Sequence, residues 1–187
     1  AAATIAKEIS LGKKVGIIDL TQGELGTRGS KELRKVEASN AAAILGVTVR
    51  ENLKFADGFF INDKEHQLEV IKSIRKYKPE IVLCNAVDDR HIDHGKGSKL
   101  VSDACFLSGL EKIETKLDGK LQEKWRPKLV YHYMQWKNTE PDFVVDVSGF
   151  IDVKMNAVLA YSSQFYDPNS KEAETPITSK NFTDSIQ

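Results

Sequence analysis

Val15-Gly16-Ile17-Ile18-Asp19-Leu20 is a short apolar run, and the polar, glycine-rich stretch Thr21-Gln22-Gly23-Glu24-Leu25-Gly26-Thr27-Arg28-Gly29 follows it directly. Such a run is typical of a strand that is buried on both faces of a parallel sheet. A helix is expected next, because Ser30 suits a helix N-cap and Gly46 suits a helix end. The stretch therefore predicts a strand, a functional loop and a helix, which together form one unit of an α/β fold.

The rest of the chain continues this alternation of strands and helices. Further strands are expected at 47–53, 80–85, 128–134 and 143–147, further helices at 4–9, 67–77, 96–110 and 150–165, and a long polar surface loop at 167–180. Helices that alternate with apolar strands favour a Rossmann-like, three-layer α/β fold with a mainly parallel sheet. The 187 residues are predicted to form a single domain, 1–187.

Composition argues against several classes of partner. The 27 basic side chains balance the 27 acidic ones, so nothing indicates binding to nucleic acid. No apolar run reaches the roughly 18 to 20 residues of a membrane helix, and no signal peptide is recognisable, so no membrane partner is expected. Cys84 and Cys105 each lie alone in an apolar run, which predicts buried thiols in a reducing compartment and a cytoplasmic protein.

Reactive side chains gather in two loops that follow predicted strands. Ligands of open α/β sheets bind beyond the carboxyl ends of the strands. The loop after Leu20 carries Glu24 and Arg28, and the loop after the strand at 80–85 carries Arg90-His91-Ile92-Asp93-His94. Imidazole and carboxylate are ligands of catalytic zinc, and histidine also transfers protons near neutral pH. The alternative is that His91 and His94 only start a helix and hydrogen-bond to neighbouring carboxylates.

Two other active-site motifs are not supported by the sequence. The spacing of Gly23, Gly26 and Gly29 fits neither the dinucleotide fingerprint nor the P-loop, so a phosphate-binding loop has little support. No serine lies in a GxSxG setting, which argues against a serine hydrolase. His66 and His132 lack neighbouring reactive residues and are interpreted as structural.

Five motifs spread over the chain resemble one enzyme family. They are Thr4 to Lys7, Gly16 to Gly26, Glu32 to Glu37, Asp89 to His94 and Tyr161 to Phe165. Together they resemble the LmbE or PIG-L superfamily, and in particular the deacetylases of bacillithiol biosynthesis. The resemblance implies a homo-oligomeric enzyme that uses one Zn²⁺ to remove acetyl from an N-acetylglucosaminyl conjugate, such as N-acetylglucosaminyl-malate.

The resemblance also assigns roles to individual residues. It implies that His94 is a metal ligand and that His91 is the general acid or stabilises the oxyanion, with Asp93 orienting it. Arg34 corresponds to an arginine that holds the substrate, Glu24 and Asp57 correspond to acidic contacts of the sugar, and Arg90 is counted with these substrate-binding residues. These roles follow from the resemblance and not from spacing.

The chain departs from the family pattern at both ends. The family's His-Pro-Asp-Asp run, which supplies the other metal ligands and the general base, is expected just upstream of Thr4, where Ala1, Ala2 and Ala3 stand instead. Residues 1–187 are therefore expected to lack that strand and motif, the C-terminal end of the domain and a complete active site. Phe182 lies near the position at which some relatives have an active-site tyrosine. The resemblance therefore does not imply that a tyrosine stabilises the oxyanion in this chain.

Two other functions fit the same residues. A catalytically inactive, sugar-binding module could keep this fold without the metal. A metal-dependent phosphoesterase could use the same histidines and carboxylates.

Overall fold

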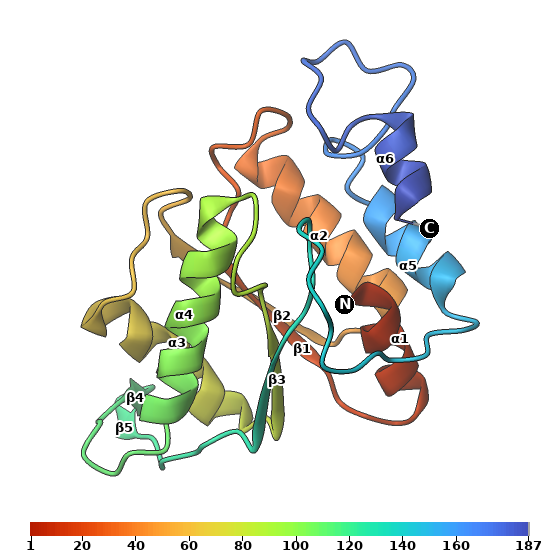
Figure 1. Ribbon diagram of the computed structural model, residues 1–187. Coiled ribbons are helices and arrows are strands. Elements are labelled where there is room, and N and C mark those ends of the chain that lie inside the picture. Colours follow the sequence, from red (N-terminus) through yellow and green to blue (C-terminus); the bar gives the residue numbers. More distant parts are fainter. Residues whose placement is uncertain (187) are drawn as a thin grey trace. The chain divides into compact units, whose positions relative to one another are not determined.

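The computed structural model describes residues 1–186 (Figure 1). Its elements are α1 (Ala2–Ser10), β1 (Gly16–Thr21), α2 (Lys31–Leu45), β2 (Val49–Phe55), α3 (Lys64–Tyr77), β3 (Ile81–Cys84), α4 (Ile92–Leu107), β4 (Lys116–Leu117), β5 (Lys120–Leu121), β6 (Leu129–His132), α5 (Ile151–Leu159) and α6 (Lys180–Ser185). They form two compact units: unit 1 comprises Ala1–Lys54 and the residues from Asp142 onward, and unit 2 comprises Phe55–Pro141. The prediction of a single domain stays a prediction.

Unit 1 combines a pair of strands with helices that pack through small side chains. Gly16 lies beside Val49, and the backbone oxygen of Thr21 accepts a hydrogen bond of 2.6 Å from the Asn52 side chain, so β1 and β2 run in the same direction. Helices α1 and α2 pack against α5. The buried cluster between these elements consists of Ala6, Ala41, Ala42, Leu45, Val47 and Ala157. Four alanines in this cluster let the helix backbones approach closely.

Helix α2 has the boundaries that the sequence predicts. The Ser30 hydroxyl accepts a hydrogen bond from the Leu33 N–H, and Gly46 adopts the left-handed conformation that ends many helices, with φ of 76°. Both signals are local, so the sequence alone suffices to place them.

Unit 2 contains a second pair of parallel strands. Ile81 of β3 lies opposite Leu129 of β6, and Cys84 lies opposite His132. Helices α3 and α4 pack side by side (Figure 1), with Ile71 and Leu100 almost completely buried. The small antiparallel hairpin of β4 and β5 turns at Asp118 and Gly119, which both have positive φ, as a two-residue hairpin loop requires.

The structure confirms a mixed α/β fold with parallel strands and corrects several details. The expected strand at 143–147 is irregular, with Val144 82% exposed, although its residues are apolar. The helix expected at 150–165 ends at Leu159, and α4 begins at Ile92 rather than at Lys96.

The hairpin of β4 and β5 and helix α6 were not predicted, and β1 is half-buried rather than fully buried. Among residues 1–186, no helix is long and apolar enough to cross a bilayer.

Both cysteines are free and buried, as predicted. Burial raises the pKa of the Cys84 thiol to about 11 and that of Cys105 to about 12. The thiolate, which is the reactive form, is therefore scarce near neutral pH. We expect both thiols to react slowly with Ellman's reagent at pH 8 in the native protein and completely after denaturation, as followed by absorbance. Rapid reaction of either thiol in the native protein would contradict this expectation.

Candidate active site

The first turn of α4 brings three predicted site residues together just beyond the carboxyl end of β3. His91 is the N-cap of α4, and its Nδ1 accepts a hydrogen bond of 3.2 Å from the backbone N–H of Asp93. The imidazole rings of His91 and His94 lie with their centroids 5.2 Å apart. Because Nδ1 of His91 is an acceptor, the ring hydrogen of neutral His91 resides on Nε2. His91 therefore presents an N–H group that can donate a hydrogen bond.

A buried carboxylate orients His94. Nδ1 of His94 hydrogen-bonds to Oδ2 of Asp89, whose side chain is 0% exposed. The other oxygen of Asp89 accepts from the backbone N–H groups of Trp136 at 3.0 Å and Lys137 at 3.1 Å. Burial would raise the pKa of the Asp89 carboxyl, but the hydrogen bonds from His94 and from backbone N–H groups outweigh it and lower the pKa to about 2. Asp89 is thus an ionised acceptor that fixes the ring of His94.

The carboxylate of Asp93 holds the neighbouring loop, whereas its backbone N–H contacts the ring of His91. Its carboxylate accepts a hydrogen bond of 2.7 Å from the Gly58 N–H and lies 3.5 Å from Lys96 Nζ, which also donates to the Gly58 oxygen at 2.8 Å. These contacts fix the loop that carries Asp57 beside the first turn of α4. The hydrogen bond that orients His91 comes from the backbone N–H of Asp93.

Arg90 lies at the edge of the histidine pair. Its guanidinium stacks over the indole of Trp136, with 4.8 Å between the guanidinium carbon and the ring centroid. Both side chains remain exposed to solvent. Unit 2 therefore assembles Asp57, Arg90, His91, Asp93 and His94.

Glu24 and Arg34, the other predicted substrate-binding residues, belong to unit 1. The Arg34 guanidinium packs against the backbone of Gly23 and Gly26, so closely that a Cβ added to Gly26 would collide with Nη2 and one added to Gly23 would lie 3.3 Å from Nη1. Oε2 of Glu24 accepts a hydrogen bond of 3.2 Å from the Gln22 N–H at the start of the same turn. The absence of side chains at these two glycines thus leaves room for the guanidinium of Arg34.

A buried carboxylate of α2 holds the motif at Tyr161–Phe165, which in turn contacts the glycine-rich loop. Glu37, which is 2% exposed, accepts hydrogen bonds from the Ser163 N–H at 2.7 Å, the Ser163 hydroxyl at 2.9 Å and the Ser162 hydroxyl at 3.2 Å. The Gln164 amide then donates to the Arg28 oxygen at 2.8 Å. The bond from the Ser163 N–H takes the place of the bond that this group would make in a continuous helix, and α5 ends at Leu159.

Replacing Glu37 by glutamine is expected to lower the free energy of unfolding by about 2 kcal/mol, because a buried charged acceptor loses hydrogen bonds. Urea denaturation measures this loss. The matched control is Glu32→Gln on the same helix, where the side chain is 72% exposed, and this change should leave stability almost unaltered. Equal stability of the two variants would contradict the role assigned to Glu37.

The described residues fit only part of a metal site. His94 is suited to be one ligand, since a carboxylate holds its Nδ1, as is usual for metal-binding histidines. Within residues 1–186 no group of three His, Cys, Asp or Glu side chains could hold a metal ion. The geometry also agrees in part with the alternative in which the two histidines only begin a helix and bind neighbouring carboxylates, because His91 caps α4 and His94 pairs with Asp89.

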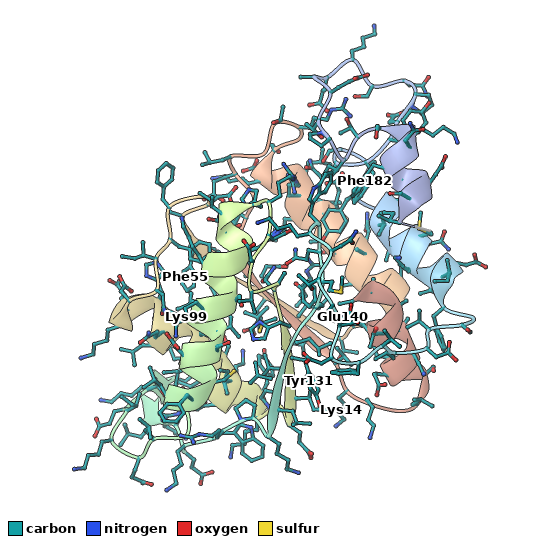
Figure 2. All side chains as sticks on the ribbon, in the orientation of Figure 1. Lys14, Phe55, Lys99, Tyr131, Glu140 and Phe182 are labelled. Atoms are coloured by element: carbon teal, nitrogen blue, oxygen red, sulfur yellow. The ribbon has the colours of Figure 1, made fainter. Side chains whose placement is uncertain are left out.

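The remaining histidines and Phe182 have structural surroundings. His66 pairs with Asp63 at the start of α3, with 2.7 Å between Nδ1 and Oδ1. His132 lies 2.9 Å from the Ser98 hydroxyl. Phe182, labelled in Figure 2, lies on α6 and stacks on Phe165.

The sequence predicts no role for Asp89, Gln135 and Trp136, although Asp89 lies in the motif that includes His94. Asp89 had a local signal, since it is the first residue of the motif that ends at His94. Gln135 and Trp136 follow β6, more than 40 residues further along the chain, and reach the histidines only because β3 and β6 pair in parallel. No spacing rule could have linked them to His94.

The fold and this site define a mixed α/β protein with a cluster of histidines and carboxylates beyond the carboxyl end of a parallel strand. Residues 1–105, more than half of the chain, match the family model described as PIG-L: GlcNAc-PI de-N-acetylase. The chain belongs to this family.

Individual relatives show where the similarity lies. The chain is 30% identical over 173 residues to the diacetylchitobiose deacetylase of Thermococcus kodakarensis, and the match covers 87% of this chain but only 63% of that protein. A conserved protein from Thermus thermophilus has a solved structure with a TM-score of 0.82 and 36% identity, over 88% of this chain and 72% of that one.

Two further structures share the fold. The N,N'-diacetylchitobiose deacetylase of Pyrococcus horikoshii gives a TM-score of 0.76 at 22% identity, over 89% of this chain and 65% of that one. GalB, the 4-carboxy-2-hydroxymuconate hydratase of Pseudomonas putida KT2440, gives 0.72 at 25% identity, over 88% and 73%. The fold therefore accommodates more than one reaction, and function has to be argued from the site.

Proposed function

We propose that this chain belongs to an enzyme that hydrolyses the acetamido group of an N-acetylglucosaminyl conjugate. Membership of the PIG-L family supports amide hydrolysis, and so does the similarity to a relative named as a diacetylchitobiose deacetylase. The observation that carries the proposal is the pair of His91 and His94 beside buried Asp89, because it combines a hydrogen-bond donor with an oriented imidazole whose Nε2 is suited to bind a metal ion.

The residues of this chain divide the work in the proposed reaction. Neutral His91 stabilises the developing oxyanion by donating a hydrogen bond from Nε2, or, as imidazolium, it gives a proton to the departing amine and becomes neutral imidazole. Asp93 holds His91 through its backbone and the Asp57 loop through its carboxylate. Arg34, Glu24, Asp57 and Arg90 bind and orient the substrate.

We further propose one zinc ion as cofactor. His94 would be one ligand, and the others are expected in a His-Pro-Asp-Asp run upstream of Thr4. Such an ion, when bound, supplies Lewis-acid chemistry for amide hydrolysis. Metal analysis of the full-length protein by mass spectrometry should give about one zinc per chain.

N-acetylglucosaminyl-malate is our proposed substrate. Its malate carries carboxylates, and the exposed guanidinium of Arg90 beside the histidines is a suitable partner for a carboxylate. The alternative within the same chemistry is an N-acetylglucosamine oligomer, the substrate type that the name of the Thermococcus relative states.

Acetate release by the full-length protein tests the function. N-acetylglucosaminyl-malate, diacetylchitobiose and N-acetylglucosamine are compared as substrates, and phosphate release from p-nitrophenyl phosphate is measured in parallel. We expect acetate from the malate conjugate at the highest kcat/KM. Sugar binding in calorimetry without acetate release would indicate an inactive binding module, and phosphate release alone would indicate a phosphoesterase.

Location and assembly are also proposals. The two free, buried thiols agree with a reducing compartment, and we propose the cytoplasm. We propose a homo-oligomer, which light scattering coupled to gel filtration would establish.

A further inference from the structure

The segment from Asp88 to Asp93 holds one positive charge that the protein itself does not neutralise. Asp88 pairs with Lys137 Nζ at 2.7 Å. Asp89 hydrogen-bonds to an imidazole and to two backbone N–H groups, and Asp93 accepts a hydrogen bond of 2.7 Å from a backbone N–H of the neighbouring loop. The Arg90 guanidinium, in contrast, has no ion pair and no hydrogen bond to another side chain among residues 1–186. Arg90 is therefore the charge of this segment that remains available to an anion.

The indole of Trp136 covers one face of this guanidinium. The guanidinium carbon of Arg90 lies 4.8 Å from the ring centroid, and Trp136 is 42% exposed. A guanidinium carries its five N–H groups in its own plane, so a ring that lies against its face leaves these donors uncovered at the edges. A stacked arginine thus keeps the two parallel N–H groups with which it binds a carboxylate.

The loop that carries Trp136 is fixed at two successive residues. The backbone N–H of Trp136 donates to Asp89 at 3.0 Å. Oε1 of Gln135 accepts hydrogen bonds of 3.1 Å from the Ala86 N–H and of 3.1 Å from the Asn85 side chain. These bonds join the loop after β6 to the loop after β3, so the indole is in place before a ligand arrives. An arginine that is already held by a fixed ring loses less side-chain entropy when it binds.

We propose that Trp136 is a positioning residue for substrate selection, because it holds Arg90 in the orientation in which the guanidinium binds a carboxylate of the substrate. The Arg90–Trp136 pair then favours sugars that carry an acidic substituent over sugars that carry a neutral one. This selection rests on the proposed function, whereas the binding of a carboxylate to the pair does not.

Carboxylate binding is tested by calorimetric titration of the full-length protein with malate alone, which requires no catalysis. Trp136→Ala should weaken malate binding about fivefold, because the guanidinium loses its contact with the ring. Trp136→Phe keeps an aromatic face and should restore most of the affinity. Arg90→Gln removes the charge and should weaken binding more than about tenfold.

A second stack in the same unit provides the matched control. The Arg126 guanidinium lies over the ring of Phe106, with 4.3 Å to the centroid, at the last turn of α4. Phe106→Ala should bind malate as tightly as the unchanged protein does. Equal affinities in Trp136→Ala and the unchanged protein would overturn the proposal. An equal loss in Phe106→Ala, or no malate binding by the unchanged protein, would also overturn it.

Selection is tested by acetate release from N-acetylglucosaminyl-malate and from the methyl glycoside of N-acetylglucosamine, which has no carboxylate. Trp136→Ala should lower the ratio of the two kcat/KM values about fivefold, through a higher KM for the malate conjugate. An equal fall for both substrates would mean that Trp136 has only a structural role. If neither substrate releases acetate, the proposed function fails, while the malate titration still decides whether the pair binds a carboxylate.

Discussion

Replacing His94 by alanine is expected to abolish acetate release from the full-length protein. Loss of a residue that only hydrogen-bonds to a metal ligand costs about 10- to 100-fold. Loss of the proposed ligand itself should therefore lower kcat/KM by more than about 100-fold and should also reduce the zinc content. His91→Ala should lower kcat by about 100- to 10,000-fold and leave the zinc content unchanged, because its proposed role is proton transfer.

A matched control separates these losses from unfolding. His66 also pairs with a carboxylate in unit 2, but it lies at the start of α3. His66→Ala should therefore retain wild-type kcat/KM, and circular dichroism should show that all three variants are folded. Wild-type rates in both His94→Ala and His91→Ala would refute the assignment of the active site.

The elements that were predicted correctly are those whose signals are local. Ser30 and Gly46 define the ends of α2 by capping geometry within a few residues. The run at 143–147 is as apolar as a strand, but a strand also needs a neighbouring strand to satisfy its backbone groups, and within residues 1–186 this run pairs with no strand. Apolar character alone therefore overpredicted strand structure.

The difference between local signals and long-range contacts also explains which residues of the candidate active site the sequence predicts. His91 and His94 were found because they lie in one motif at the end of a strand. The contacts of Gln135 depend on the register between β3 and β6, which a single sequence does not contain. The partner of Asp93 was also missed, because Gly58 lies 35 residues earlier and donates through its backbone, which leaves no mark on residue type.

Asp89 and Asp88 are adjacent carboxylates with opposite surroundings, and they offer the sharpest test of how His94 is held. Asp88 pairs with Lys137 Nζ at 2.7 Å and its side chain is 76% exposed, whereas the Asp89 side chain is completely buried between His94 and two backbone N–H groups. Asp88→Asn removes one exposed ion pair, so kcat/KM and stability should change little.

Asp89→Asn keeps the size of the side chain but replaces one acceptor oxygen by an NH₂ group. Either the NH₂ faces Nδ1 of His94 and forces the ring hydrogen onto Nε2, or it faces the backbone N–H groups and leaves the loop after β6 unsatisfied. In both cases we expect kcat/KM for acetate release to fall about 10- to 100-fold and Co²⁺ to bind correspondingly more weakly. If Asp89→Asn and Asp88→Asn behave alike, Asp89 does not position His94, and the metal-competent tautomer must have another origin.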